Sequence, residues 1–472
     1  MTMTKRYNYK DNGFILSTID DLVPDNHLVR KIESSIDWNF IYPLVEDLYS
    51  KQGRKSIDPV VLFKMIFIDK LFGINSMRKT CEEIEVNLAY RWFLGLSIYD
   101  DVPNYSTWSQ NYIRRYNDSN VFEKIFRTII SKALKLNFID ETTVFGDSTH
   151  QKASANKRKS HKETVEIIKK SYEDDLFNEI NEVRKANNQK PIKKLECEEI
   201  IFDDKTGEEI IIRKKKEIKI SDTDKECGNF HKGEHEECFA YSHQTFCDKH
   251  GFVLGYDTIP SNTHDSVSFF NVYNKLVNEY PGIKNVCLDA GYKTPAIIKA
   301  IIDNDQAPFL PYKRTPGSKD KFKRKEFAYD EFEDVYVCPN GNILEYSTTD
   351  NKGYKIYKCK EYNCTNCPLK GKCTNSKCKS ISRHVWEEYK EKAEDIRGNS
   401  MWKEIYPMRK NTIERVFAED KENHCLRFTR LKGLNKNRHN AAIIFSCHNL
   451  KKLSLWLWKN PINRTYIKGY AH

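Results

Sequence analysis

Three acidic residues stand in settings that suit metal-assisted chemistry: Asp147 in Phe-Gly-Asp-Ser-Thr-His, Asp289 in Val-Cys-Leu-Asp-Ala-Gly-Tyr and Glu414 in Thr-Ile-Glu-Arg-Val-Phe. The two aspartates end short apolar runs that predict strands, and the glutamate lies in an apolar i, i+3, i+4 pattern that predicts a helix. Carboxylates of this kind can converge at one edge of a sheet, where such hard oxygen ligands suit Mg²⁺. Two ions about 4 Å apart would clamp the attacking and leaving oxygens of a phosphodiester exchange. Any one of these residues alone is more often a cap or turn residue.

The residues around these carboxylates form longer motifs. They are Asp-Ser-Thr-His-x-Lys-Ala-Ser-Ala-Asn-Lys at 147–157, Leu-Asp-Ala-Gly-Tyr at 288–292 and Tyr406-x2-Arg409-x4-Glu414-x6-Lys421. In this order, and over nearly the whole chain, the sequence resembles the DDE transposases of bacterial insertion sequences, most closely the insertion sequence 1182 family, which is related to the insertion sequence 4 and 5 groups. The resemblance implies a ribonuclease H-like catalytic domain in which Asp147, Asp289 and Glu414 are the catalytic residues and hold two Mg²⁺ ions.

The third motif also predicts DNA contacts. Tyr406, Arg409 and Lys421 are spaced to lie near Glu414 along one helix, expected from Trp402 to Glu422 with its lead-in. The resemblance assigns such residues to the backbone of the transposon end. The related signature commonly leaves three residues between Arg and Glu, whereas this chain has four, which bears on the role of Arg409. The alternative is a salt-bridged helix surface.

Positive charge gathers around the acidic motifs. The net charge is +11, and residues 423–472 hold ten Lys or Arg and no Asp or Glu, five of the ten lying between Arg427 and Arg438. A second cluster comprises Lys313, Arg314, Lys319, Lys321, Lys323, Arg324 and Lys325. One cluster alone is usually a solvated face, but two that bracket candidate Mg²⁺ ligands favour a polyanion crossing the site. The sequence therefore predicts nucleic acid as the partner.

Residues 1–135 predict an all-helical domain. Asp58 followed by Pro59 is a helix start, and an apolar face follows as far as Gly73. Further helices are expected after Ser76 and from Ser106 through Tyr116. The polar side of the latter includes Arg114 and Arg115, which suit a helix in a DNA groove. An ordinary helical bundle with an exposed polar side is the alternative, and the resemblance favours a helix-turn-helix-like domain that binds terminal inverted repeats.

Residues 136–472 predict the catalytic domain. Strands are expected at about 142–149, 238–247 and 252–259, then a helix to Tyr280, a fourth strand that delivers Asp289, and a short fifth strand at 308–312. This order predicts an α/β, ribonuclease H-like fold. Dense mixed charge at 157–235 predicts a surface insertion, helical near 174–185, and a second, Cys-rich insertion is expected at 315–395.

The Cys-rich insertion has metal-ligand spacing. The interval between Asp289 and Glu414 is 124 residues long and holds six of the fourteen cysteines. Cys364-x2-Cys367 and the knuckle-like turn after Cys338 suit zinc, and four thiolates would close a structural tetrahedral site. The expected ligands are Cys338, Cys364, Cys367 and Cys373, with Cys359 and Cys378 as alternates. Reduced, unligated thiols are the alternative.

The function expected from these features is a DNA transposase. It would bind the inverted repeats of its own mobile element and carry out metal-dependent strand cleavage and strand transfer into target DNA, as a homodimer on paired ends. Two alternatives stay open: a ribonuclease H-like nuclease that does not join strands, and a catalytically inert DNA-binding protein of transposase descent. No signal segment or membrane span is expected, and the predicted location is the bacterial cytoplasm, at the nucleoid.

Overall fold

In the computed structural model the chain divides into two units, and the first is assembled from separate parts of the sequence. It comprises Met1–Phe138, Glu419–Leu426 and His439–His472, and the second comprises Ile139–Ala418 and Arg427–Arg438. The structure describes residues 16–53, 55–166, 172–192, 198–202, 209–213, 215–232, 236–263, 265–313 and 320–459. The sequence had assigned everything beyond residue 136 to the catalytic domain, whereas 419–426 and 439–472 group with the helices that precede it.

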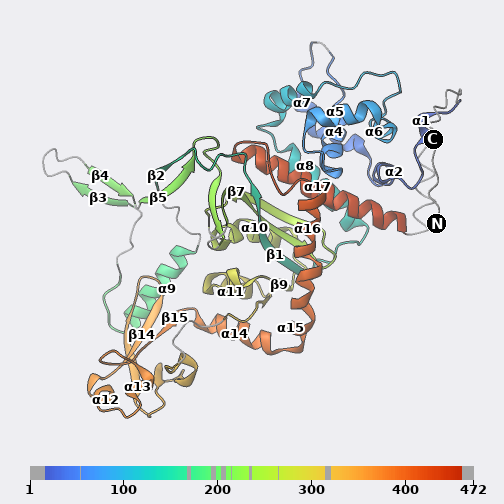
Figure 1. Cartoon of the computed structure of the whole chain (residues 1–472). Helices are drawn as coiled ribbons and strands as arrows, with labels where there is room; N and C mark the ends of the chain where they lie inside the picture. The colour runs from blue at the N-terminus through green and yellow to red at the C-terminus, as the bar shows by residue number, and fades with distance from the viewer. Residues whose placement is uncertain are drawn as a thin grey trace, which may run out of the picture. The chain divides into compact units, whose positions relative to one another are not determined.

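The first unit is helical, and its helix starts follow the sequence. Asp58 caps α4 by accepting a hydrogen bond from the Val60 N–H at 2.7 Å, and Pro59 occupies the first turn, as expected. The named α-helices before residue 136 are α1 (Ile19–Leu22), α2 (Leu28–Glu33), α3 (Ile41–Val45), α4 (Pro59–Leu71), α5 (Met77–Val86), α6 (Leu88–Leu94), α7 (Tyr105–Asn111) and α8 (Val121–Lys135). The long C-terminal helix α17 (Leu434–Lys459) contributes its residues from His439 onward to this unit (Figure 1).

The helix expected from Ser106 to Tyr116 differs in two ways. Its N-cap lies two residues earlier, because the side chain of Asn104, not that of Ser106, accepts the capping hydrogen bond. Its α-helical part then ends at Asn111 and continues as a π-helical turn, η3 (Tyr112–Tyr116). π-Turns are uncommon and are found inside helices, frequently at functional sites.

The second unit is built on a six-stranded mixed sheet. The strands are β1 (Thr143–Lys152), β6 (Gly228–Lys232), β7 (Glu236–Asp248), β8 (Val253–Pro260), β9 (Asn285–Cys287) and β10 (Ala307–Phe309). The hydrogen-bonded order is β10-β9-β1-β7, with both β8 and β6 paired to β7. β9 and β10 run parallel to β1 and β7 runs antiparallel to it. The helices α10 (Asp265–Glu279) and α11 (Pro295–Asp303) connect β8 to β9 and β9 to β10.

The five strands expected from the sequence are therefore present, but β6 was not expected. It lies inside the segment 157–235 that the sequence assigned to a surface insertion, and Gly228–Lys232 pairs with Glu236–Ala240 of β7. The strand is hard to predict because the segment 157–235 has mixed charge throughout and only Gly228–Lys232 of it pairs with β7. The rest of the segment includes β2 (Ser160–Glu166), β3 (Glu198–Phe202), β4 (Glu209–Arg213), β5 (Lys215–Ser221) and the expected helix, α9 (Glu173–Ala186).

The Cys-rich segment forms a second, antiparallel sheet. Its strands are β11 (Ala328–Asp330), β12 (Val335–Val337), β13 (Ile343–Thr349), β14 (Tyr354–Cys359) and β15 (Ser380–His384), hydrogen-bonded in that order. Two short helices, α12 (Glu361–Thr365) and α13 (Lys370–Cys373), lie between β14 and β15 in the chain. Helix α9 lies against this sheet, and Arg184 bonds to the carbonyl oxygen of Thr349 at 2.8 Å (Figure 1).

The helix expected from Trp402 to Glu422 is broken into pieces. After α14 (Glu387–Gly398), the chain forms α15 (Ser400–Ile405), the 3₁₀ segment η6 (Tyr406–Asn411) and α16 (Ile413–Asn423). Pro407 lacks a backbone N–H and so interrupts the α-helical ladder, and Thr412 takes non-helical angles, φ −114° and ψ −102°. Arg409 and Glu414 are consequently on different helical segments.

Candidate active site

Asp147 and Asp289 lie side by side because their strands are in register. In the parallel pair β1–β9, Phe145 is opposite Cys287. Two residues further along each strand direction come Asp147 and Asp289, which share the side-chain direction of that pair. Neighbouring strands are about 4.8 Å apart, and β9 ends at Cys287, so Asp289 lies just past the carboxyl end of β9, near Asp147 on β1.

Close packing under the site requires Gly146. A Cβ on this residue would lie 2.6 Å from side-chain atoms of both Leu288 and Phe246. Glycine therefore allows β1 to approach its neighbours just before Asp147.

One arginine joins the two aspartates. The Nη2 of Arg409 is 2.7 Å from Oδ2 of Asp147, and its Nη1 is 3.7 Å from Oδ1 of Asp289. The Arg409 side chain is only 5% exposed, against 22% for Asp147 and 56% for Asp289. Burial alone would lower the pKa of Arg409, but the two carboxylates outweigh it and raise that pKa above its ordinary value.

Neither aspartate is accounted for by capping alone. Asp289 precedes the 3₁₀ turn η4 (Ala290–Tyr292), yet its side chain makes no capping hydrogen bond. Asp147 accepts from the Ser148 N–H at 2.8 Å through Oδ1, and its other oxygen takes Arg409. The interpretation of these residues as ordinary cap or turn residues therefore does not describe Asp289.

Glu414 is not brought into contact with the two aspartates by any observed interaction. It is exposed in the first turn of α16, five residues after Arg409. Within the described ranges, no three His, Cys, Asp or Glu side chains are close enough to hold a metal ion as they stand. Its assignment as the third ligand stays a prediction. Lys421, also predicted to contact DNA, lies in the last turn of the same helix.

Tyr406 and Trp402 form a stack beside Arg409. The two rings are 4.7 Å apart and nearly parallel, at 8°. The Nε1 of Trp402 donates to the carbonyl oxygen of Leu310 at 2.9 Å, just past β10. Trp402 thus anchors the segment that carries Tyr406 and Arg409 to the sheet edge, which is the packing role that its half-buried position suggests.

A buried polar bridge that the sequence does not predict lies behind the aspartates. The side chain of Gln244, on β7, donates to the carbonyl oxygen of Asp147 at 3.4 Å and accepts from the Tyr292 hydroxyl at 2.7 Å. Gln244 is fully buried, and Tyr292 is the last residue of the Leu-Asp-Ala-Gly-Tyr motif. The bridge fixes the β1 backbone relative to the turn after Asp289. The one indication of this bridge in the sequence is a polar Gln in the middle of a predicted strand.

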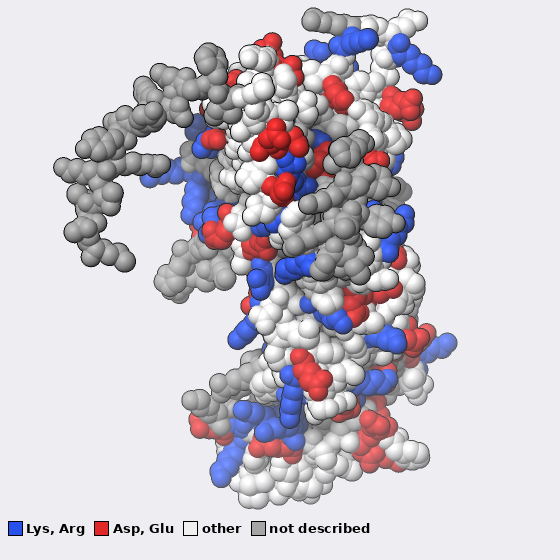
Figure 2. Space-filling model, turned by 90° about the vertical axis from the view of Figure 1, so that its right-hand side faces the viewer, with Lys and Arg blue, Asp and Glu red and all other residues white. Residues whose placement is uncertain are grey.

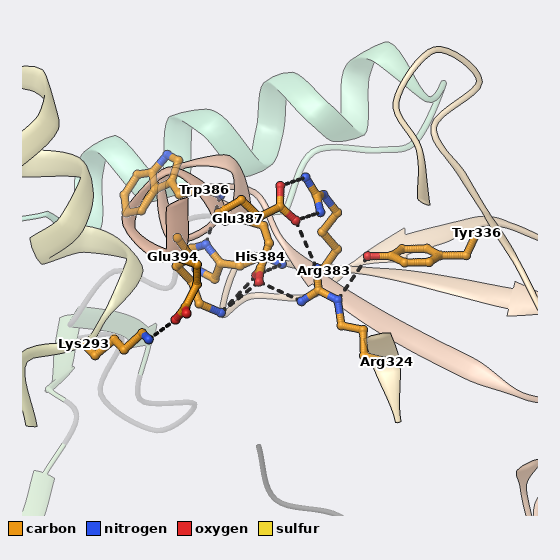
Figure 3. Close-up of polar contacts among 10 residues, drawn as sticks. Lys293, Arg324, Tyr336, Arg383, His384, Trp386, Glu387 and Glu394 are labelled. Carbon is orange, nitrogen blue, oxygen red and sulfur yellow. Dashed lines mark hydrogen bonds and ion pairs between the residues drawn. The ribbon is translucent and has the colours of Figure 1, made fainter. Parts of the chain in front are cut away.

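A chain of ion pairs connects this turn to the second sheet through α14 (Figure 3). Lys293, which follows the turn, pairs with Glu394 of α14. About one turn earlier on that helix, Glu391 takes Arg383 of β15 in a bidentate pair at 2.5 and 2.8 Å. Two turns earlier, Glu387 takes Arg324 at 2.8 Å and Lys390 at 3.0 Å. These contacts tie the Cys-rich sheet to the segment that carries Asp289.

Two residues of the basic cluster at 313–325 are engaged within the protein, and the role of this cluster in binding a polyanion stays a prediction. Lys321 donates to the Gly371 carbonyl oxygen and to Asn375, and Arg324 is engaged by Glu387. Arg314 and Lys319 lie outside the described residues. On the face shown in Figure 2, the visible Lys and Arg side chains are interspersed with Asp and Glu.

The basic stretch from Arg427 to Arg438 lies next to the end of β1. The Thr429 N–H donates to the Lys152 carbonyl oxygen at 2.9 Å, and the Lys152 N–H donates to the Arg427 carbonyl oxygen at 3.2 Å. The Lys and Arg side chains of this stretch are exposed, although Arg438 pairs with Asp257 at 3.5 Å. An exposed, positively charged segment is thus hydrogen-bonded to the strand that carries Asp147.

The cysteines of the second sheet line one small cavity. It measures about 20 Å³, room for about one water-sized sphere. The cysteines that line it are Cys338, Cys359, Cys364, Cys367 and Cys373. Backbone amides point at two of the sulfurs: Asn342 N–H at Cys338, 3.3 Å, and Lys379 N–H at Cys364, 3.5 Å. The expected knuckle is present, with Gly341 at φ +75°.

Arg114 and Arg115 have unequal roles in the helical unit. Arg115 bonds to Asn111 and lies over the Tyr49 ring at 4.4 Å, whereas Arg114 is exposed. Both line a surface hollow of about 530 Å³ with Leu48, Ile113, Asp118, Ser119 and Asn120. Arg114 therefore suits a phosphate contact better than Arg115.

Comparison with known families finds two matches, in separate segments of the chain. Residues 17–114 match the family described as "Transposase domain (DUF772)", and residues 337–454 match the family described as "Transposase DDE domain". The chain therefore carries a DUF772 transposase domain and a DDE transposase domain, and together these matches support a DNA transposase. Comparisons with curated proteins and with solved structures find no match.

The DDE transposase domain implies a phosphoryl-transfer enzyme that acts on DNA, a ribonuclease H fold and the use of Mg²⁺. The second matched segment includes Glu414, but neither segment includes Asp147 or Asp289. Among the described helices, none is long and apolar enough to cross a membrane.

Proposed function

We propose that this transposase binds the terminal inverted repeats of its own mobile element and carries out metal-dependent strand cleavage and strand transfer at the edge of the six-stranded sheet. The observation that carries the proposal is the pair Asp147 and Asp289, each two residues past the last β1–β9 register pair and both held by one buried arginine. Such a pair supplies the hard oxygen donors that Mg²⁺ requires.

The donor set fits a divalent cation. Asp289 is half-exposed and its carboxylate does not cap the turn behind it, so its oxygens are accessible to a ligand. We assign Asp147, Asp289 and Glu414 as the residues that would hold two Mg²⁺ ions, and the ions would supply Lewis-acid activation and charge neutralisation at the phosphate. Gln244 and the Lys293–Glu394 pair keep the two strand ends in place.

DNA contacts are assigned to both units. We assign Arg114 of the helical unit to a contact with the terminal repeat. Arg115 would support this contact indirectly, because it holds Asn111 and Tyr49. Tyr406, Arg409 and Lys421 support contacts to the transposon-end backbone, together with the exposed stretch Arg427–Arg438. Because transposition must pair two ends, we propose a homodimer on DNA.

A joining assay tests the catalytic proposal. The purified chain and a plasmid carrying the DNA that flanks its gene are incubated with Mg²⁺, and cleaved and joined products are counted. Asp289→Asn should lower both by at least about a hundredfold, because several kcal/mol of transition-state stabilisation depend on the metal site. End binding, measured by fluorescence anisotropy, should stay near the wild-type value.

Asp305→Asn is the matched control. It removes the same charge at an exposed turn with φ +56°, which Asn also tolerates, and should leave cleavage unchanged. Cleavage without joining would identify a nuclease, and binding without cleavage by the wild-type chain would identify an inert DNA-binding protein. Full activity of the Asp289→Asn chain would reject the assigned site.

We further propose that the Cys-rich sheet holds one structural Zn²⁺ through Cys338, Cys364, Cys367 and Cys373, with Cys359 as the alternate ligand. The single-ion size of the cavity and the amides directed at two sulfurs support this assignment. The thiols would have to draw together on the ion, because no three of them are close enough to hold a metal as they stand in the described residues. Burial raises the pKa of Cys359 to about 12, so an unligated thiol there stays protonated. Elemental analysis should find about one zinc per chain, reduced in Cys367→Ser but unchanged in Cys378→Ser, because Cys378 does not line the cavity. Zinc-free wild-type protein with an unaltered melting curve would dispose of the site.

A further inference from the structure

Arg409 stands where a cation is expected between the two aspartates. Its guanidinium spans from Asp147 at 2.7 Å to Asp289 at 3.7 Å, and carboxylates on neighbouring strands would otherwise repel each other. The side chain is almost completely buried, so this interaction is weakly screened by solvent. In the free protein, Arg409 therefore offsets the repulsion between the two carboxylates, as a bound metal ion would.

The same geometry makes Arg409 an obstacle to metal. A divalent cation bound by these oxygens would lie a few ångströms from a guanidinium that already uses them, and like charges at such distances repel strongly. The position is also imperfect for the arginine, because its Nε is buried without a hydrogen-bond partner among the described residues. Arginine has an alternative partner of matching geometry in a phosphate group.

We infer that Arg409 is a displaceable counter-cation: it holds Asp147 and Asp289 in the free protein and passes to a DNA phosphate when an end binds, so that cation loading follows DNA binding. This inference rests on the proposed function and adds an order of events to it. It would keep the phosphodiester-cleaving site closed to metal until a transposon end is in place.

The local backbone suits such an exchange. Arg409 lies on the short 3₁₀ segment η6, and the non-helical Thr412 separates it from α16. Short 3₁₀ stretches have weaker hydrogen-bond geometry than an α-helix and often mark hinges. On the other side, the stack of Trp402 on Tyr406 and the bond of Trp402 to Leu310 hold the segment to the sheet. A movement of Arg409 would therefore leave its anchor intact.

The test measures Mn²⁺ binding to the full chain without DNA, by electron paramagnetic resonance. Arg409→Gln should bind Mn²⁺ about tenfold more tightly than the wild type, the order expected when a cation no longer displaces a charge-assisted hydrogen bond. Arg409→Lys keeps the charge and should not show this gain. Lys410→Gln removes a charge at the next, exposed position and should change the affinity by less than about twofold.

A second arm adds a duplex made from the DNA that flanks the gene. The duplex should tighten Mn²⁺ binding by the wild type, and by linkage Mn²⁺ should tighten duplex binding by the same factor. Arg409→Gln should lose this coupling. Melting curves establish that each variant is folded, and if Arg409→Gln is not, the wild-type coupling alone decides.

Two failures can be told apart. Equal Mn²⁺ affinity of wild type and folded Arg409→Gln, with binding lost in Asp289→Asn, would overturn the inference and keep the metal site. Binding that is unaffected by Asp289→Asn would overturn the metal site itself. Absence of DNA coupling in the wild type would also reject the exchange.

Discussion

Asp289 differs from Asp58 and Thr294, which also precede helices, because its side chain makes no capping hydrogen bond. The side chains of Asp58 and Thr294 each accept a hydrogen bond from a backbone N–H in the first turn of the helix that follows, whereas that of Asp289 does not. Its negative charge is balanced by Arg409, which comes from a distant part of the sequence. A carboxylate that neither caps a helix nor is buried is available to a ligand, which is why its setting is more informative than its residue type.

We expect substitutions of Arg114 and Arg115 to have different effects, the first on DNA affinity and the second on stability. Arg114→Ala should weaken end-DNA binding several-fold and lower the salt dependence of binding, since an exposed arginine releases counterions when it meets a phosphate. Arg115→Ala should mainly lower the melting temperature, because Arg115 holds Asn111 and covers Tyr49. Fluorescence anisotropy at two salt concentrations and thermal melts measure both. A stable Arg115→Ala chain with the larger loss of affinity would reverse this assignment.

At the scale of elements, local patterns predicted what local forces determine. β1, β7, β8, β9 and β10 and the cap at Asp58 follow from apolar runs and capping chemistry. The break at Pro407 was visible but was overridden by the apolar spacing around Glu414. The strand β6 was concealed by charge, because its pairing with β7 is a tertiary choice.

The site shows the same division. The sequence predicted the strands that lead to Asp147 and Asp289, but not the contact of Arg409 with Asp147, which joins residues 262 positions apart. Gln244 was missed because its two partners come from two other elements. Spacing within one segment cannot report such contacts.

Helix α14 and β15 give the second sheet a dependence on pH through His384. This residue is buried, faces Glu387 and Lys390, and accepts from the Trp386 N–H at 3.1 Å through Nδ1. Burial lowers its pKa to about 4. The unfolded chain takes up a proton near pH 6.5, so the stability contribution is full above that value and is lost as pH falls toward 4, on the order of 2 kcal/mol at pH 5.

His384→Asn removes the titration and keeps an oxygen where Nδ1 accepts its hydrogen bond. The variant should lose less melting temperature between pH 7 and pH 5 than the wild type does, measured by circular dichroism. His231→Asn, at an exposed position on β6, is the control and should follow the wild type. Identical pH dependence of the wild type and His384→Asn would refute the role given to this histidine.

At the scale of the whole molecule, the helical unit depends on both ends of the described chain. His424, from the 419–426 segment, bonds to the Lys70 carbonyl oxygen at 3.0 Å, and His448 of α17 pairs with Asp420 at 2.8 Å. His439 accepts or donates a bond with the Tyr112 hydroxyl at 2.8 Å. The helical unit is therefore not an N-terminal segment that can be removed intact.

Truncation tests this dependence. A fragment of residues 1–138 lacks the buried side chains of α17, which include Ile443, Ile444, Phe445, Leu450 and Leu453. Each is worth about 2 kcal/mol on burial, and together they approach the whole stability of a typical domain. The fragment should therefore aggregate or melt without a cooperative transition. The same fragment joined to residues 413–459 by a flexible Gly/Ser linker should regain a cooperative melt and bind end DNA. A cooperative melt of the 1–138 fragment, equal to that of the joined protein, would show that the C-terminal helix is dispensable to the unit.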